Sequence, residues 1–166
     1  MRFEIHHDFE LPLDAVERAV LSPDLAPALA RSMPPNIESV ELLEHELKDG
    51  ALHRVLRFQA SAPFAMFRRY NVAKTAMSWE EESTYRLSEH RSSWTVTPRT
   101  EWGRYVRSEG TYRLESVGPG QTRRTVEGAL DIRLALLGPL VERLAVAEVK
   151  KTYDAEAVTL TQLARV

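Results

Sequence analysis

The sequence contains no cysteine, so disulfide bonds, thiolate nucleophiles and cysteine-ligated metal sites are excluded. It also lacks a bias toward one sign of charge, because 22 Lys and Arg stand against 24 Asp and Glu and give a formal net charge of -2. A nucleic-acid-binding surface normally gives a domain a basic excess, so we expect no nucleic-acid partner. The longest apolar run, Leu134 to Val141, is too short to span a bilayer and contains Gly138 and Pro139.

Targeting signals and the common catalytic motifs are missing as well. The first residues, Met1 to Glu4, alternate and are charged, unlike a signal peptide, so the expected location is the cytoplasm. The sequence has no nucleophile elbow, phosphate-binding glycine loop or dinucleotide fingerprint. The 5 histidines show no metal-binding spacing, so we expect neither a metal nor a cofactor.

The sequence does contain long stretches of alternating apolar and polar residues, which predict β-strands. Such strands are expected at residues 2–9, 37–48, 51–60, 75–87, 92–98, 105–117 and 121–133. Two short helices are expected between Pro12 and Arg31, and a long helix after Gly138-Pro139 closes the sequence. No linker or repeat divides the 166 residues, so we expect one domain covering residues 1–166.

This order of elements predicts an α+β container. Short turns such as Asp49-Gly50 join neighbouring strands, which gives one antiparallel sheet of about seven strands. A sheet of this size twists and curls, and its concave face must be covered. A terminal helix of about 25 residues would be roughly 40 Å long, enough to cross that face.

Four segments of the sequence carry a resemblance to START-like domains, a superfamily also called SRPBCC, helix-grip or Bet v 1-like. They are Phe3-Glu4-Ile5-His6-His7-Asp8-Phe9, Ser108-Glu109-Gly110-Thr111-Tyr112-Arg113-Leu114, Glu127-Gly128-Ala129-Leu130-Asp131-Ile132 and Leu137-Gly138-Pro139-Leu140-Val141-Glu142. More narrowly, the sequence resembles a bacterial family of that superfamily that is distantly similar to PRELI-type lipid-transfer domains.

The resemblance implies a helix-grip fold with an apolar cavity between the sheet and the C-terminal helix. In the superfamily such cavities hold lipids, sterols, polyketides or plant metabolites, and some members are cyclases or hydrolases. No catalytic motif of the superfamily matches this sequence, so the resemblance supplies no catalytic residue.

Several strand residues could face such an interior. The aromatic candidates for the lining are Phe58, Trp79, Trp94 and Tyr112. Large aromatic residues either fill a core or form the walls of a ligand site, and the sequence leaves both open. His7 shares its strand face with Phe3, Ile5 and Phe9, so it is either a polar group inside the cavity or a hydrogen-bonded core histidine.

The terminal helix has two apolar stripes on nearly opposite sides. One stripe contains Leu144, and Glu148 and Lys151 fall within it at a spacing that allows an ion pair. The other contains Val149, Tyr153 and Leu160. If the first stripe faces the sheet, Leu144, Glu148 and Lys151 line the cavity. If it does not, they are solvated, and the unused stripe suits a homodimer contact or the two short helices.

The segment after the third strand offers two interpretations. Its residues Phe64, Met66, Phe67, Arg68 and Arg69 combine apolar and cationic side chains, as in a loop that contacts a membrane peripherally. The alternative is a strand entrance with buried aromatics. In the next strand, alternation places Glu80 and Glu82 together on the solvent side.

Taken together, these patterns favour binding of a hydrophobic small molecule or lipid rather than catalysis, with transfer of that ligand as an additional hypothesis. One alternative is an enzyme of the cyclase, dehydratase or hydrolase type that acts in the same cavity with His7 as acid or base. Another is a partner-binding module in which the cavity is vestigial.

Overall fold

The computed structural model describes residues 1–35, 37–60, 78–99, 104–133 and 138–166. The elements are β1 (Arg2–Phe9), α1 (Leu13–Leu21), α2 (Leu25–Ser32), β2 (Ile37–Lys48), β3 (Ala51–Ala60), β4 (Ser78–Arg86), a short 3-10 helix η3 (Leu87–Glu89), β5 (Arg91–Pro98), β6 (Val106–Gly118), β7 (Gln121–Ile132) and α3 (Gly138–Ala164). The predicted α+β class, the strand order along the chain and the long final helix are therefore confirmed.

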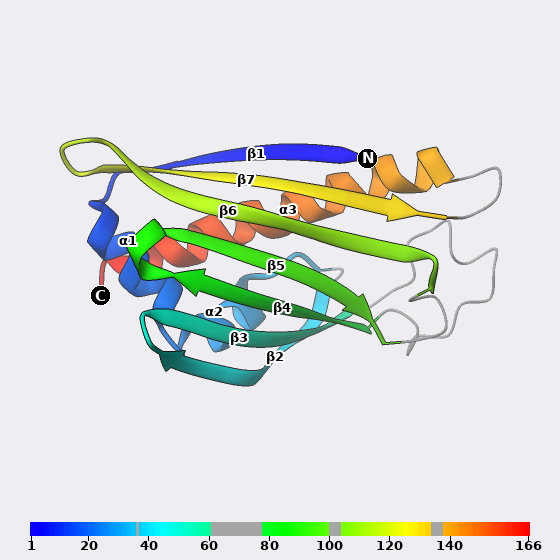
Figure 1. The fold of residues 1–166 in the computed structure, drawn as a ribbon, viewed down its shortest axis with the longest axis horizontal. Coiled ribbons are helices and arrows are strands. Elements are labelled where there is room, and N and C mark those ends of the chain that lie inside the picture. Colours follow the sequence, from blue (N-terminus) through cyan, green and yellow to red (C-terminus); the bar gives the residue numbers. More distant parts are fainter. Residues whose placement is uncertain (36, 61–77, 100–103, 134–137) are drawn as a thin grey trace.

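The seven strands form one antiparallel sheet in the order β1-β7-β6-β5-β4-β3-β2. Figure 1 shows the strands running along the length of the molecule, with α3 behind β7 and β6 and with α1 and α2 at one end. The first strand, β1, forms one edge of the sheet beside β7, and Ile5 pairs there with Val126. The Asp49-Gly50 turn has positive φ angles of 52° and 75°, as tight two-residue hairpins require.

The helices and one face of the sheet bury a continuous apolar core. α1 and α2 each present an apolar side, and Val16, Val20, Leu25 and Leu29 are almost completely buried there. This main core extends across β1, β3, β5 and β6. A second, separate cluster lies toward the other end, where Leu130, Ile132 and Val141 pack together.

The structure shows which of the two apolar stripes of α3 faces the sheet. Leu160 is completely buried and Tyr153 packs against the main core, whereas Leu140, Leu144 and Val158 are 53%, 46% and 55% exposed. The stripe with Val149, Tyr153 and Leu160 therefore faces the sheet. In the described chain, α3 approaches β1, β7, α1 and α2 closely, but its backbone has no comparable approach to β3, β4 or β5.

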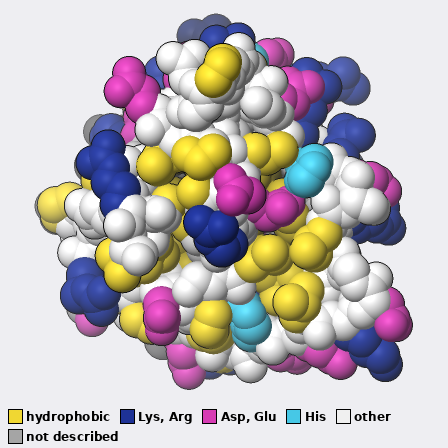
Figure 2. Space-filling model, turned by 90° about the vertical axis from the view of Figure 1, so that its left-hand side faces the viewer, with side chains coloured by type: hydrophobic (Ala, Val, Ile, Leu, Met, Phe, Trp, Pro, Cys, Tyr) yellow, Lys and Arg dark blue, Asp and Glu magenta, His cyan; other side chains and the backbone are white. Residues whose placement is uncertain are grey.

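The outer surface carries no obvious single-sign patch on the face that Figure 2 shows, where apolar, acidic and basic side chains are interspersed. Within the described ranges, none of the helices is long and apolar enough to cross a membrane. The segment with Phe64, Met66, Phe67, Arg68 and Arg69 lies outside the described residues, so its predicted membrane contact stays a prediction.

Candidate functional site

Arg124 of β7 is the central polar residue between the sheet and α3. Its side chain is fully buried, and its Nη1 donates to Oε2 of Glu156 at 2.7 Å. Its Nη2 donates to the Tyr153 carbonyl at 3.1 Å and lies 3.3 Å from Nδ1 of His7. The guanidinium also lies over the rings of Phe9, Tyr112 and Tyr153, at 5.4 to 5.9 Å from their centroids. These contacts tie α3 to the edge of the sheet.

His7 lies beside this guanidinium and has both ring nitrogens engaged. Nε2 is 2.9 Å from Oδ1 of Asp154 on α3, and Nδ1 accepts from Arg124. This geometry requires the tautomer with the proton on Nε2. Burial, followed by the charge of Arg124, lowers the pKa of His7 against the opposing effect of Asp154. His7 therefore serves as a neutral link between β1 and α3.

Aromatic side chains cover much of the concave face. Phe58 and Trp79 stack with ring centroids 5.5 Å apart and planes 8° from parallel. Trp94 lies 6.4 Å from Phe3 on one side and 6.4 Å from Tyr153 on the other, so it connects the sheet with α3. The indole nitrogen of Trp94 is buried without a hydrogen-bond partner.

Two facing glycines make room for this aromatic layer. A side chain at Gly110 would collide with the ring of Trp94 and the backbone of Glu127, and one at Gly128 would collide with the ring of Phe3. Gly110 and Gly128 are paired across β6 and β7. The absence of side chains at both positions therefore lets the rings lie close to the sheet.

Glu81 is the one acidic residue of β4 on the concave face. Glu80 and Glu82 lie on the opposite face, where they contact Arg57 and His53. Among the described residues, the Glu81 carboxyl forms no hydrogen bond or ion pair, although it retains some accessible surface. Burial raises the pKa of Glu81 to about 7, with a further contribution from the charge of Glu156.

Two arginine side chains oppose this increase in the pKa of Glu81. The charges of Arg54 and Arg124 lower the pKa of Glu81, but by less than burial raises it. Arg54 is 6% exposed, and its Nη1 donates to the Val20 carbonyl at the end of α1 at 2.8 Å. The Glu81 side chain is thus half-buried and partly desolvated.

The structure brings five of the predicted lining residues to the concave side. These are His7, Phe58, Trp79, Trp94 and Tyr112. It does not bring Leu144 and Lys151 there, because both are exposed on the outward side of α3. Lys151 Nζ donates to Oε1 of the half-buried Glu148 at 2.7 Å, so these two form the pair that their spacing predicts. Their role in ligand binding stays a prediction.

The sequence analysis missed three inward-facing charged residues, Arg54, Glu81 and Arg124. The signal for Glu81 was present, because strand neighbours alternate and Glu80 and Glu82 belong on the solvent side. Arg54 likewise alternates with apolar residues in a strand whose other inward positions are Leu52, Leu56 and Phe58. A charged residue at an inward position normally requires a partner, and sequence alone does not identify one.

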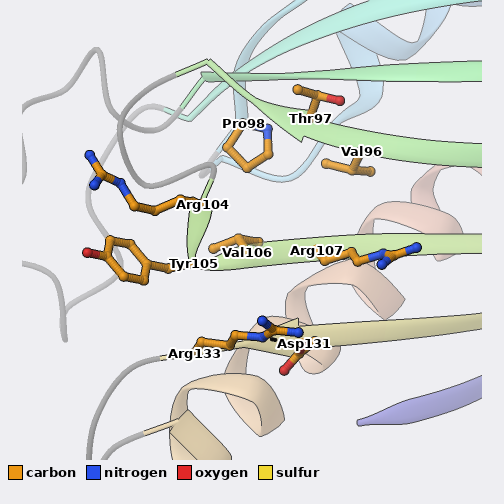
Figure 3. A pocket seen from close by; sticks show the side chains of 9 residues that line it. All are labelled: Val96, Thr97, Pro98, Arg104, Tyr105, Val106, Arg107, Asp131 and Arg133. Atoms are coloured by element: carbon orange, nitrogen blue, oxygen red, sulfur yellow. Dashed lines mark hydrogen bonds and ion pairs between the residues drawn. The ribbon is translucent and has the colours of Figure 1, made fainter.

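A separate shallow pocket of about 310 Å³ lies at the ends of β5, β6 and β7 (Figure 3). Its lining includes Arg107 and Arg133, and these two arginines already contact Glu109 at 3.2 Å and Asp131 at 3.0 Å. Because these ion pairs are exposed and partly neutralise the cations, we assign this pocket no function.

An open antiparallel sheet gripped by a long C-terminal helix, with two short helices after the first strand, is the START-like or Bet v 1-like fold. The predicted helix-grip fold is thereby confirmed. More narrowly, the chain belongs to the family described as "Protein of unknown function (DUF2505)", whose model matches residues 4–163. No curated protein matches the sequence.

Solved structures with the same fold come from several sources. The protein TTHA0849 from Thermus thermophilus has a TM-score of 0.67 and 15% identity, over 99% of this chain and 97% of that one. The Zhui aromatase/cyclase from Streptomyces sp. R1128 has a TM-score of 0.68 and 16% identity, over 99% and 93%. A START superfamily protein from Mycobacterium smegmatis has a TM-score of 0.62 and 16% identity, over 98% of each chain. At these identities the similarity establishes the fold alone.

Proposed function

We propose that this protein binds a hydrophobic small molecule or lipid between the concave face of the sheet and α3. The observation that carries the proposal is the position of α3, which approaches the edge strand β1 and its neighbour β7 but not the middle strands β3 to β5 in the described chain. Trp79 and Glu81 of β4 and Val149 of α3 occupy inward positions and are still partly accessible.

The chemistry of this region suits an apolar ligand with a polar group. The Phe58–Trp79 stack offers flat apolar surface, and transfer of a ligand's apolar surface from water contributes about 25 cal/mol per Å². A few polar groups on such a wall select among ligands rather than drive binding. Transfer between membranes and peripheral membrane contact are finer forms of this proposal, and they depend on the segment from Phe64 to Arg69.

The direct test uses a side chain that fills the proposed site. Val149→Trp on the inward side of α3 should abolish binding of the neutral fluorescent probe N-phenyl-1-naphthylamine, because the indole would occupy the probe's space. Leu144→Trp adds the same group on the outward side of the same helix and should leave probe binding unchanged. Equal binding by the two variants would contradict the proposal. Native mass spectrometry of the protein purified from its own host should show the co-purified ligand.

An enzyme acting in the same interior is the second candidate, and the pKa of about 7 at Glu81 favours it. A carboxyl with this pKa can accept and return a proton near neutral pH. His7 is a poor choice for that role because both of its ring nitrogens are engaged. In this form of the proposal, Glu81→Gln would abolish turnover of the bound ligand, whereas pure binding predicts no chemical change of the ligand in either form.

The partner-binding alternative has a definite surface. Leu140, Leu144 and Val158 are exposed on the outward side of α3 and would form the contact in a homodimer. The oligomeric state in solution, measured by sedimentation at several concentrations, tests this proposal independently of the ligand.

A further inference from the structure

Glu81 differs from the other inward-facing charged residues in how it is partnered. Arg124 is paired with Glu156, His7 with Asp154, and Arg54 with the Val20 carbonyl. Within the part of the chain that the structure describes, Glu81 has no such partner and keeps accessible surface. A half-buried carboxyl without a protein partner can offer its hydrogen-bonding capacity to a ligand.

The position of Glu81 matches that of a ligand contact. It lies on the same face of β4 as Trp79, two residues away, and it is directly opposite Leu56 of β3 and Val96 of β5. The carboxyl is therefore surrounded on the sheet by apolar side chains and by the Phe58–Trp79 stack. Across the interior it faces α3, whose Tyr153 and Glu156 interact with it electrostatically.

We propose that Glu81 is the polar contact of the interior ligand, and that this ligand carries a hydroxyl group, an alcohol or a phenol, on an otherwise apolar body. This inference rests on the proposed binding function and specifies its chemistry. A hydroxyl can donate to an ionised carboxylate and can accept from a protonated carboxyl. It therefore satisfies Glu81 in either protonation state.

Other polar groups fit the surroundings less well. A cationic amine would meet the charges of Arg54 and Arg124, which offset those of Glu156 and ionised Glu81. A carboxylate or phosphate would be repelled by Glu156 and by ionised Glu81, and both arginines are buried. Arg124 is fully buried in its ion pair, and Arg54 is 6% exposed. A neutral hydroxyl meets neither obstacle.

The protonation of Glu81 also supports the assignment of a hydroxyl ligand. The groups that face Glu81 are Arg54 of β3, Tyr112 of β6, Arg124 of β7, and Tyr153 and Glu156 of α3. Burial raises the pKa of both tyrosines, so they stay neutral over the physiological range. Glu81, with its pKa of about 7, changes charge near neutral pH.

The test compares ligands that differ only in the polar group: 2-naphthol, 2-methylnaphthalene and 2-naphthoic acid, each titrated by calorimetry. Wild-type protein should bind 2-naphthol roughly three- to tenfold more tightly than 2-methylnaphthalene, as one additional hydrogen bond predicts. Glu81→Leu should remove this preference, and Glu81→Gln should retain most of it because the amide can still accept from the hydroxyl. Glu82→Leu, on the same strand but the opposite face, is the matched control and should behave as wild type.

Each contrary result has a separate meaning. Binding of both neutral compounds with equal affinity by wild type, or an unchanged preference in Glu81→Leu, would overturn the hydroxyl assignment and leave the binding function intact. Tighter binding of 2-naphthoic acid would overturn it in favour of an acidic ligand. Failure of all three compounds to bind, with N-phenyl-1-naphthylamine bound normally, would also overturn it. Failure of every probe, including N-phenyl-1-naphthylamine, would overturn the proposed function together with this inference.

Discussion

Arg124 and Glu156 form an ion pair across the sheet–helix interface, with Nη1 and Oε2 2.7 Å apart and the Arg124 side chain fully buried. The pair joins β7 to α3 at the edge of the sheet where the helix approaches most closely. Two further acceptors, the Tyr153 carbonyl and Nδ1 of His7, engage the other end of the guanidinium. This arrangement fixes the side of α3 that lies over β1 and β7.

Removal of Arg124 should therefore be much more harmful than removal of its neighbour. Arg124→Met leaves the Glu156 carboxylate and His7 without their partner and should reduce the free energy of unfolding by about 3–5 kcal/mol in urea denaturation. Arg123 forms an exposed ion pair with Asp8 at 2.7 Å. Arg123→Met should reduce the free energy of unfolding far less than Arg124→Met, because solvent screens the Arg123–Asp8 pair. Similar losses in both variants would show that the buried pair does not anchor α3.

The backbone pattern of this protein could be read from the sequence with good accuracy, and particular residues show why. The alternation of Phe3, Ile5, His7 and Phe9 gives β1 its bounds, and Asp49-Gly50 gives the turn between β2 and β3. These are local signals, because strand period and turn chemistry depend on neighbours in the sequence. The structure places β1 at Arg2–Phe9, as predicted.

The polar site could not be predicted in the same way, because its members come from distant parts of the chain. Glu81, Arg124 and Glu156 lie on β4, β7 and α3, and only the folded chain brings them together. The sequence also did not predict which face of α3 packs against the sheet, because both of its stripes are apolar. The outcome was set by Tyr153 and Leu160, which pack against the core formed by α1, α2 and the sheet.

A substitution at Gly110 tests the aromatic layer. The added methyl group of Gly110→Ala would collide with the ring of Trp94 and lie 2.8 Å from the Gly128 Cα, so the sheet would have to shift. We expect a loss of about 1–3 kcal/mol in the free energy of unfolding and a change in the near-ultraviolet circular dichroism of Trp94. Gly118→Ala meets only the flexible side chain of Gln121, at 3.1 Å, and should be nearly neutral. A stable Gly110→Ala with an unchanged spectrum would contradict this account.

His7 should make the protein less stable as the pH falls. Its pKa in the folded protein lies below the ordinary value of 6.5, so the unfolded chain binds more protons in the interval between the two values. Stability is therefore fully present above about pH 6.5 and decreases as the pH falls through that interval. His7→Gln should flatten this part of the pH–stability curve, whereas His6→Gln, at the exposed neighbouring position, should leave it as in wild type. An unchanged slope in His7→Gln would exclude His7 as its origin.

Glu81 should have the opposite effect on stability, which should decrease as the pH rises from 4.5 to about 7. Its pKa rises from 4.5 in the unfolded chain to about 7, so the folded protein binds the additional proton between these values. Stability is therefore lost as the pH increases from 4.5 toward 7, and at alkaline pH the cost reaches on the order of 2–3 kcal/mol. Glu81→Gln cannot ionise, so at pH values above 7 it should be more stable than wild type by a similar amount, and near pH 4.5 the two should be alike.

Thermal and urea unfolding across this range measure the difference, with Glu82→Gln as the solvent-face control that should follow wild type throughout. If Glu81→Gln follows the wild-type curve at every pH, then Glu81 titrates in contact with bulk water. The partly desolvated surroundings of Glu81 that both the binding proposal and the hydroxyl contact require would then be absent.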